Sequence, residues 1–128
     1  MIDYSEKDVW EDLKRHRVNP HPCYRAGWNR CSCAMCIFST PKLFAGIKEL
    51  YPEDFEALKQ DENVLGFTLD NKCGLDEFVG EAESCVYHGD KEAIRSLVTG
   101  EFTTDDIYVK GDWLYPAGAF HGAEGGPC

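Results

Sequence analysis

The feature that most limits how this chain can fold is a cluster of cysteines, which places Cys23, Cys31, Cys33 and Cys36 within fourteen positions. The surrounding segment, residues 19–36, also holds two prolines and a glycine. It shows neither a helical nor a strand period, so we expect an irregular loop. A loop of this length inside a compact chain is usually functional or held by a cross-link. We therefore expect one bound metal ion or cluster to join these thiols.

The cysteine content favours metal binding over disulfide bonds. The chain has seven cysteines, an odd number, and residues 1–6 show no secretory signal. Two residues separate Cys33 from Cys36, a spacing that lets both sulfurs reach one ion at ~2.3 Å. With Cys23 and Cys31 as further metal ligands, the loop would supply four thiolates. Such a set suits either tetrahedral zinc or an iron–sulfur cluster of the 4Fe-4S type, and both remain open.

The identity of the fourth ligand is a separate question. Only Ser32 separates Cys31 from Cys33, so binding of both to one ion would be strained. If one of the two is a spectator, the site must be completed by another residue: His21, Cys73, Cys85 or Cys128. The alternative without metal is a set of free cysteines or a redox Cys-x-x-C pair. A thioredoxin-like pair needs a βαβ context, which this sequence does not show.

Outside the loop, the sequence predicts a mainly α fold with irregular loops. Several short helices would surround the Cys-rich metal-binding loop within a single domain, residues 1–128. Caps, prolines and apolar spacing predict helices at residues 5–17, 40–50, 52–66, 75–84 and 90–99. One or two short strands are expected near the C-terminus, at residues 107–109 and 113–115.

Charge and hydropathy limit the partners. The formal net charge is −10, and an acidic surface repels phosphate backbones, so general nucleic-acid binding is not expected. No run approaches the ~18 apolar residues that a membrane helix needs. Residues 1–6 also lack the basic and apolar regions of a secretory signal. We therefore expect a cytoplasmic protein that does not enter a membrane.

Four short segments follow one family's pattern, in order along nearly the whole chain. They are residues 2–10 (IDYSEKDVW), 19–28 (NPHPCYRAGW), 32–36 (SCAMC) and 114–120 (LYPAGAF). Together they resemble the C-terminal part of phosphoadenosine-phosphosulfate (PAPS) reductase-like proteins, which belong to the adenine nucleotide alpha-hydrolase-like superfamily. The SCAMC and LYPAGAF segments are similar to those of a bacterial and phage subgroup of this family.

The resemblance implies a role in sulfur metabolism with an adenine nucleotide or sulfonucleotide as substrate. It also implies that Tyr24 and Arg25 bind the substrate, since family members use this region for the phosphate or sulfate. The family's Ser-Gly-Gly-x-Asp-Ser loop and parallel sheet are absent from this sequence. We therefore expect a nucleotide-binding partner chain, or a homo-oligomer. Alone, this part of an oxidoreductase or sulfur-transfer enzyme should be inactive.

One cysteine outside the cluster is a candidate nucleophile. Residues 71–76 (NKCGLD) resemble the Glu-Cys-Gly-Leu-His segment of sulfonucleotide reductases, but lack its glutamate and histidine. The resemblance makes Cys73 the candidate catalytic residue, and the neighbouring Lys72 is expected to lower its pKa. The alternative is a cysteine at a helix start beside a glycine turn.

Two other functions fit the same residues. One is a non-catalytic, metal-stapled interaction or assembly module in a phage or mobile-element setting. The other is a subunit of a nucleic-acid sulfur-modification system, against which the charge of −10 counts.

Overall fold

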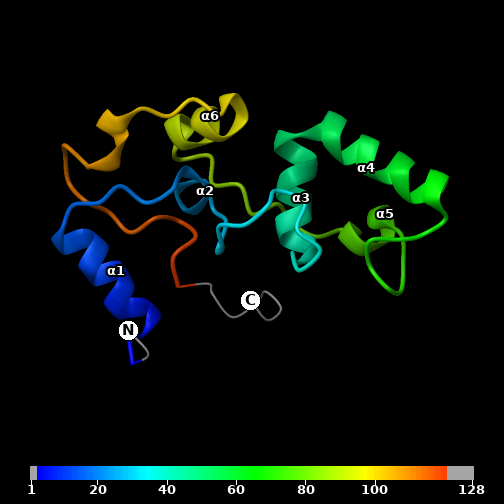
Figure 1. The fold of residues 1–128 in the computed structure, drawn as a ribbon, viewed down its shortest axis with the longest axis horizontal. Coiled ribbons are helices and arrows are strands. Elements are labelled where there is room, and N and C mark those ends of the chain that lie inside the picture. Colours follow the sequence, from blue (N-terminus) through cyan, green and yellow to red (C-terminus); the bar gives the residue numbers. More distant parts are fainter. Residues whose placement is uncertain (1–2, 121–128) are drawn as a thin grey trace. The chain divides into compact units, whose positions relative to one another are not determined.

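The computed structural model describes residues 3–120, which form two compact units (Figure 1). The first unit comprises residues 3–31 and 87–120, and the second residues 32–86. The predicted fold class is confirmed, because the described residues form six α-helices and one 3₁₀ helix joined by irregular loops, with no β-strand. None of these helices combines the length and the apolar character that crossing a bilayer requires.

The first unit begins with helix α1 (Glu6–Arg15), which its sequence caps as predicted. The Ser5 side chain accepts a hydrogen bond from the Asp8 N–H at 3.3 Å, and the Asp8 carboxylate accepts one from the Ser5 N–H at 2.8 Å. The Ser5 hydroxyl also donates to the Asp8 carboxylate at 2.6 Å, and this bond, together with that from the Ser5 N–H, holds the pKa of Asp8 below its ordinary value. Two N–H groups at the helix start are thereby satisfied by neighbouring side chains, so the signal that begins α1 is local.

Aromatic side chains from distant segments form the core of the first unit. Trp10 and Trp113 are buried together with Ala119. The Trp113 indole N–H donates to the Val18 carbonyl at 2.7 Å, which joins the last described segment to the chain after α1. The Tyr24 ring meets Trp10 edge-on, with centroids 5.3 Å apart. This core therefore closes only when residues 10–24 and 113–119 meet.

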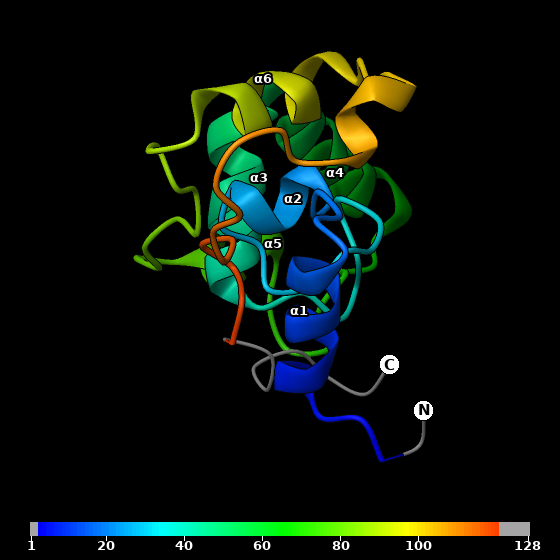
Figure 2. The same ribbon diagram turned by 90° about the vertical axis from the view of Figure 1, so that its left-hand side faces the viewer.

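Helices α2 (Pro22–Arg25) and α6 (Lys91–Thr99) lie side by side in this unit (Figure 2). The sequence predicts α6 but not α2. The cap at Asp90 correctly predicted α6, and the Asp90 carboxylate accepts from the Ala93 N–H at 2.9 Å. By contrast, the prediction of a purely irregular loop over residues 19–36 is wrong, because α2 interrupts it. Pro22 occupies the first turn of α2, where its missing N–H costs nothing.

The predicted C-terminal strands do not form. Thr104–Ile107 is a 3₁₀ helix, and Tyr108 makes a single antiparallel bridge to Val18. Residues 113–115 are irregular, and the Trp113 indole N–H of this segment donates to the Val18 carbonyl. A β-strand needs a partner ladder, and this segment pairs with the chain only around Val18.

The second unit contains α3 (Pro41–Leu50), α4 (Pro52–Leu65) and α5 (Leu75–Val79). The first two match their predicted ranges, and their apolar faces bury Phe44, Ile47 and Phe55. Helix α5 is shorter than the predicted range of 75–84. It ends at Gly80, whose φ of 50° leaves the helical region. Glycine adopts such a φ without steric cost, so α5 stops there.

The close approach of two backbones makes Gly118 a test of the first unit. A Cβ atom at Gly118 would overlap the Trp28 carbonyl oxygen, whereas one at Gly111 would meet nothing within 4 Å. We expect Gly118→Ala to lower the free energy of unfolding by about 1–3 kcal/mol, because the chain must shift to make room.

Urea unfolding followed by tryptophan fluorescence measures this effect, since Trp10, Trp28 and Trp113 all lie in the first unit. Gly111→Ala is the matched control, with an expected change below about 0.5 kcal/mol. Equal stability of the two variants would contradict the close contact.

Candidate metal centre

The structure brings together three possible metal ligands in the first unit: His21, Cys23 and Cys31. One ligand atom from each side chain lies within 4.8 Å of the others. His21 caps α2 and Cys23 lies in its first turn, while Cys31 is six positions beyond the end of the helix. Cys23 is buried, and His21 and Cys31 are exposed. An ion could therefore reach the group from solvent without opening the core.

The donor atoms of this group suit a transition metal. An imidazole nitrogen and two thiol sulfurs are part of the Cys₂His₂ and Cys₃His sets that bind tetrahedral zinc. Three protein ligands leave one tetrahedral position for another donor. A 4Fe-4S cluster is held by cysteine thiolates, and His21 does not match that pattern. The group can thus hold a metal ion such as zinc.

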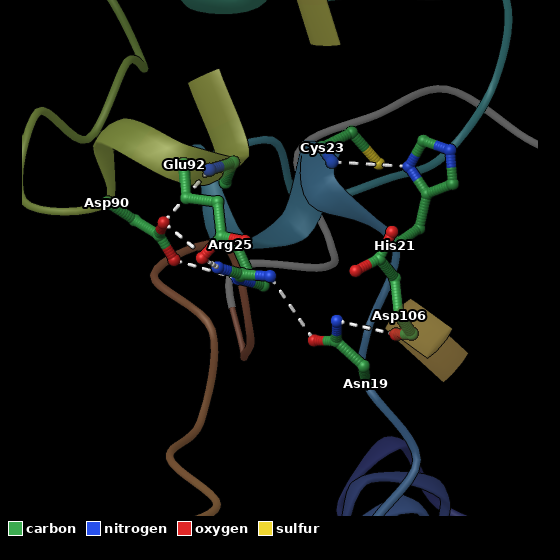
Figure 3. Close-up of polar contacts among 8 residues, drawn as sticks. Asn19, His21, Cys23, Arg25, Asp90, Glu92 and Asp106 are labelled. Carbon is green, nitrogen blue, oxygen red and sulfur yellow. Dashed lines mark hydrogen bonds and ion pairs between the residues drawn. The ribbon is translucent and has the colours of Figure 1, made fainter. Parts of the chain in front are cut away.

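The His21 ring makes a hydrogen bond that metal binding would replace. Its Nδ1 accepts from the Cys23 N–H at 3.2 Å, so in the neutral ring the proton is on Nε2 (Figure 3). Coordination through Nδ1 would use the lone pair that now caps α2. Coordination through Nε2 would move the proton to Nδ1 and end the same hydrogen bond. Either way, binding of an ion would replace this capping hydrogen bond with a metal–nitrogen bond at the start of α2.

Burial governs the charge state of Cys23. It raises the pKa of this thiol well above the ordinary range, and the neighbouring Cys31 thiol raises it further. Without a nearby cation, the thiol therefore keeps its proton at neutral pH. A bound metal ion displaces such a proton, because the thiolate is the form that coordinates.

Tyr24 follows Cys23 in α2 and contacts the same group. Its hydroxyl accepts a hydrogen bond from the Cys31 N–H at 3.2 Å. Burial raises the pKa of Tyr24, although the bond from Cys31 counteracts it. The hydroxyl therefore stays protonated and neutral. The predicted contact of Tyr24 with a substrate anion remains a prediction.

Arg25, the other predicted substrate-binding residue, makes several contacts with protein groups (Figure 3). Its Nε and Nη2 donate to the two Asp90 carboxylate oxygens at 2.8 and 3.0 Å. Glu92 lies 3.7 Å from Nη2, and the Asn19 side-chain oxygen accepts from Nη1 at 3.4 Å. A substrate anion at Arg25 would have to compete with Asp90. Sequence reasoning missed this pairing, because Asp90 is 65 positions away and its only local signal is that of a helix cap.

The other predicted metal ligands lie elsewhere in the chain. Cys33 and Cys36 belong to the second unit, where Cys33 is exposed and Cys36 half-buried. Cys85 is buried, which raises its pKa to about 12. Cys128 lies outside the described residues. Of the four predicted cysteine ligands, the structure therefore groups Cys23 and Cys31.

The surroundings of Cys73 differ from the expected activated thiol. Its pKa is raised, not lowered, because partial burial and the Asp70 carboxylate disfavour the thiolate. The Cys73 sulfur lies 3.7 Å from Asp70 Oδ1. The expectation that Lys72 would lower this pKa is therefore wrong, since the charges that act on this thiol are those of carboxylates.

Comparisons with known proteins yield one distant similarity. No protein-family model matches the chain, and no solved structure matches it. An uncharacterized 37.8 kDa protein in the gpa 5′ region of Escherichia phage 186 is 28% identical over 65 residues. The match covers 51% of this chain and 20% of the phage protein. The chain therefore has a phage relative, and it spans only about a fifth of that relative's length.

The Arg25–Asp90 ion pair beside the metal group should be measurable. The two side chains are only 22% and 25% exposed, so removing one partner leaves a poorly solvated charge. We expect Arg25→Ala to lower the free energy of unfolding by about 1–3 kcal/mol at pH 7, as measured by urea unfolding with tryptophan fluorescence. Glu92→Ala is the control, because this exposed carboxylate is a peripheral partner, and its expected effect is below about 0.5 kcal/mol.

The same pair predicts a pH dependence. Burial would raise the pKa of Asp90, but hydrogen bonds from Arg25 and the Ala93 N–H outweigh it and hold the pKa below the ordinary value. A lowered pKa contributes stability above the unfolded value of about 3.9 and loses it as the pH falls through the folded value. The difference between wild type and Arg25→Ala should therefore shrink below about pH 3.9. A difference that stays constant with pH would argue against the pair.

Proposed function

We propose that this chain is a zinc-stapled, non-catalytic interaction or assembly module. The observation that carries the proposal is the convergence of ligand atoms from His21, Cys23 and Cys31 within 4.8 Å. Two of these residues belong to the start of α2 and the third to the loop that follows it. One ion would therefore cross-link a short helix to an irregular segment. Structural zinc sites of this kind supply folding free energy directly.

Such a cross-link would order two parts of the chain that have little other support, α2 and Cys31. Helix α2 has only four residues, and so short a helix does not persist on its own. Cys31 is exposed, so burial does little to fix its side chain. A metal ion would constrain both, and the Tyr24 ring of the same helix packs against the buried Trp10.

Zinc is favoured over an iron–sulfur cluster for a chemical reason. The group mixes one imidazole with two thiols, which is ordinary for zinc, whereas four thiolates are the usual set for a 4Fe-4S cluster. Cys33 and Cys36 remain predicted ligands from their Cys-x-x-C spacing.

Metal analysis of protein purified without oxygen tests the proposal. We expect about one zinc per chain in wild type and a loss of most of it in Cys31→Ala and His21→Ala, because each removes a ligand. Both residues are exposed, so neither substitution opens the core. Ser32→Ala is the matched control and should retain the metal, since this exposed residue next to Cys31 offers neither a thiol nor an imidazole. Wild type without zinc, or full zinc content in Cys31→Ala, would refute the proposed site.

The same preparation separates zinc from iron and identifies further ligands. A colourless protein with zinc supports the mixed site, and a brown protein with iron and sulfide would support a cluster instead. Variants Cys33→Ala and Cys36→Ala test the predicted role of each cysteine. Loss of metal in one of these variants identifies the substituted cysteine as a ligand.

A second function, that of the C-terminal portion of a PAPS reductase-like sulfur-metabolism protein, has separate support. The phage relative is about five times the length of the matched region, so the matched sequence corresponds to part of a larger protein there. The ordered segments that resemble the family, ending in LYPAGAF at residues 114–120, lack the family's nucleotide loop. Under this proposal, a nucleotide-binding partner would supply that loop and this chain the metal-stapled remainder.

Calorimetric titration with adenylyl sulfate tests the second function. We expect no measurable binding by the chain alone, because the sequence offers no phosphate-binding loop. Binding should appear after mixing with the product of a neighbouring gene that encodes a Ser-Gly-Gly-x-Asp-Ser segment. Tight binding by the isolated chain would contradict the division of labour, and no binding by the mixture would remove the second function.

A further inference from the structure

We propose that Tyr24 is a positioning residue for the metal centre, acting through Cys31. By accepting a hydrogen bond from the Cys31 N–H, the Tyr24 hydroxyl would set where the Cys31 sulfur lies relative to His21 and Cys23. The inference rests on the proposed zinc site and adds to it a residue that touches no metal.

The first support is the geometry of Cys31 itself. Cys31 is exposed and lies in an irregular segment, so neither burial nor a helix orders it. Its backbone N–H nevertheless donates to the Tyr24 hydroxyl at 3.2 Å. A hydrogen bond to the amide of a residue restricts the direction of its Cα–Cβ bond, and hence the arc available to its sulfur. The Cys31 sulfur does lie within 4.8 Å of the other two ligand atoms.

The second support is that Tyr24 is itself held in place. Its ring packs edge-on against buried Trp10, with centroids 5.3 Å apart. Its own carbonyl accepts from the Gly118 N–H at 2.8 Å and from the Gly27 N–H at 3.2 Å. A tyrosine held at both its ring and its backbone has little rotamer freedom, so the position of its hydroxyl is fixed relative to the aromatic core. Through it, the core determines the position of an otherwise exposed ligand.

The energetic consequence follows from preorganisation. A ligand that is already in place loses less conformational entropy on binding an ion than one drawn from a mobile loop. Hydrogen bonds from outside the coordination sphere typically change metal affinity by about 10–100-fold when removed. The loss of the Tyr24 hydroxyl should fall in this range.

Tyr24→Phe tests the inference, because it removes the hydroxyl and keeps the ring against Trp10. Affinity for Co²⁺, a coloured substitute for zinc, is measured by titration in the presence of a competing chelator. We expect about 10–100-fold weaker binding than wild type. Tyr115→Phe is the matched control in the same unit, since its hydroxyl donates to Glu11 away from the metal group. Its affinity should equal that of wild type.

A double-mutant cycle with Cys31→Ala shows whether Tyr24 acts through Cys31. In that background Tyr24→Phe should have no further effect, because the ligand it positions is gone. If Cys31→Ala binds too weakly to compare, the thiolate-to-Co²⁺ charge-transfer band decides. This band should be weaker in saturated Tyr24→Phe than in saturated wild type, because the Cys31 thiolate is misplaced.

The outcomes separate the two proposals. Wild-type affinity in Tyr24→Phe, or an equal loss in the Cys31→Ala background, would overturn the positioning role and leave the zinc site intact. An unchanged charge-transfer band in saturated Tyr24→Phe would also count against it. Wild type that binds no Co²⁺ would overturn both the zinc site and the inference.

Discussion

The bidentate ion pair between Arg25 and Asp90 supports the element on which the candidate metal centre is built. Helix α2 is four residues long, and its own hydrogen bonds cannot offset the entropy of ordering it. Arg25, at its last position, meets both Asp90 oxygens at 2.8 and 3.0 Å. The same carboxylate accepts the Ala93 N–H and so caps α6. The Asp90 side chain thereby joins the four-residue helix α2 to the start of the nine-residue helix α6.

From that anchored helix, consecutive side chains serve different purposes. Cys23 is buried and belongs to the metal group, while Tyr24 packs its ring against Trp10 and turns its hydroxyl to the Cys31 amide. The group is therefore half core and half surface, with His21 and Cys31 facing solvent. Such a placement suits a site that stabilises a module, because the ion has access and one ligand is rigid.

Most of the helices could be predicted from the sequence, because their signals are local. Ser5, Thr40 and Asp90 each cap a helix through their side chains, and all three helices were expected. The errors also have physical causes. Helix α2 was hidden by two prolines, although Pro22 occupies the first turn, where proline is favoured. The predicted range of α5 runs past Gly80, where the helix ends. No ladder forms at residues 113–115, because the one β-bridge of the described residues joins Val18 to Tyr108 and no neighbouring strand continues it.

By itself, the sequence determined the helical class and the presence of a ligand-rich loop, since caps, prolines, apolar spacing and clustered cysteines act over a few residues. Only the tertiary structure decided which of those ligands meet. His21 joined Cys23 and Cys31, and Arg25 found Asp90 sixty-five positions away. Contacts of that kind depend on how distant segments close around the aromatic core. No local pattern encodes them, because the loop-closure entropy they overcome is offset by burial elsewhere in the unit.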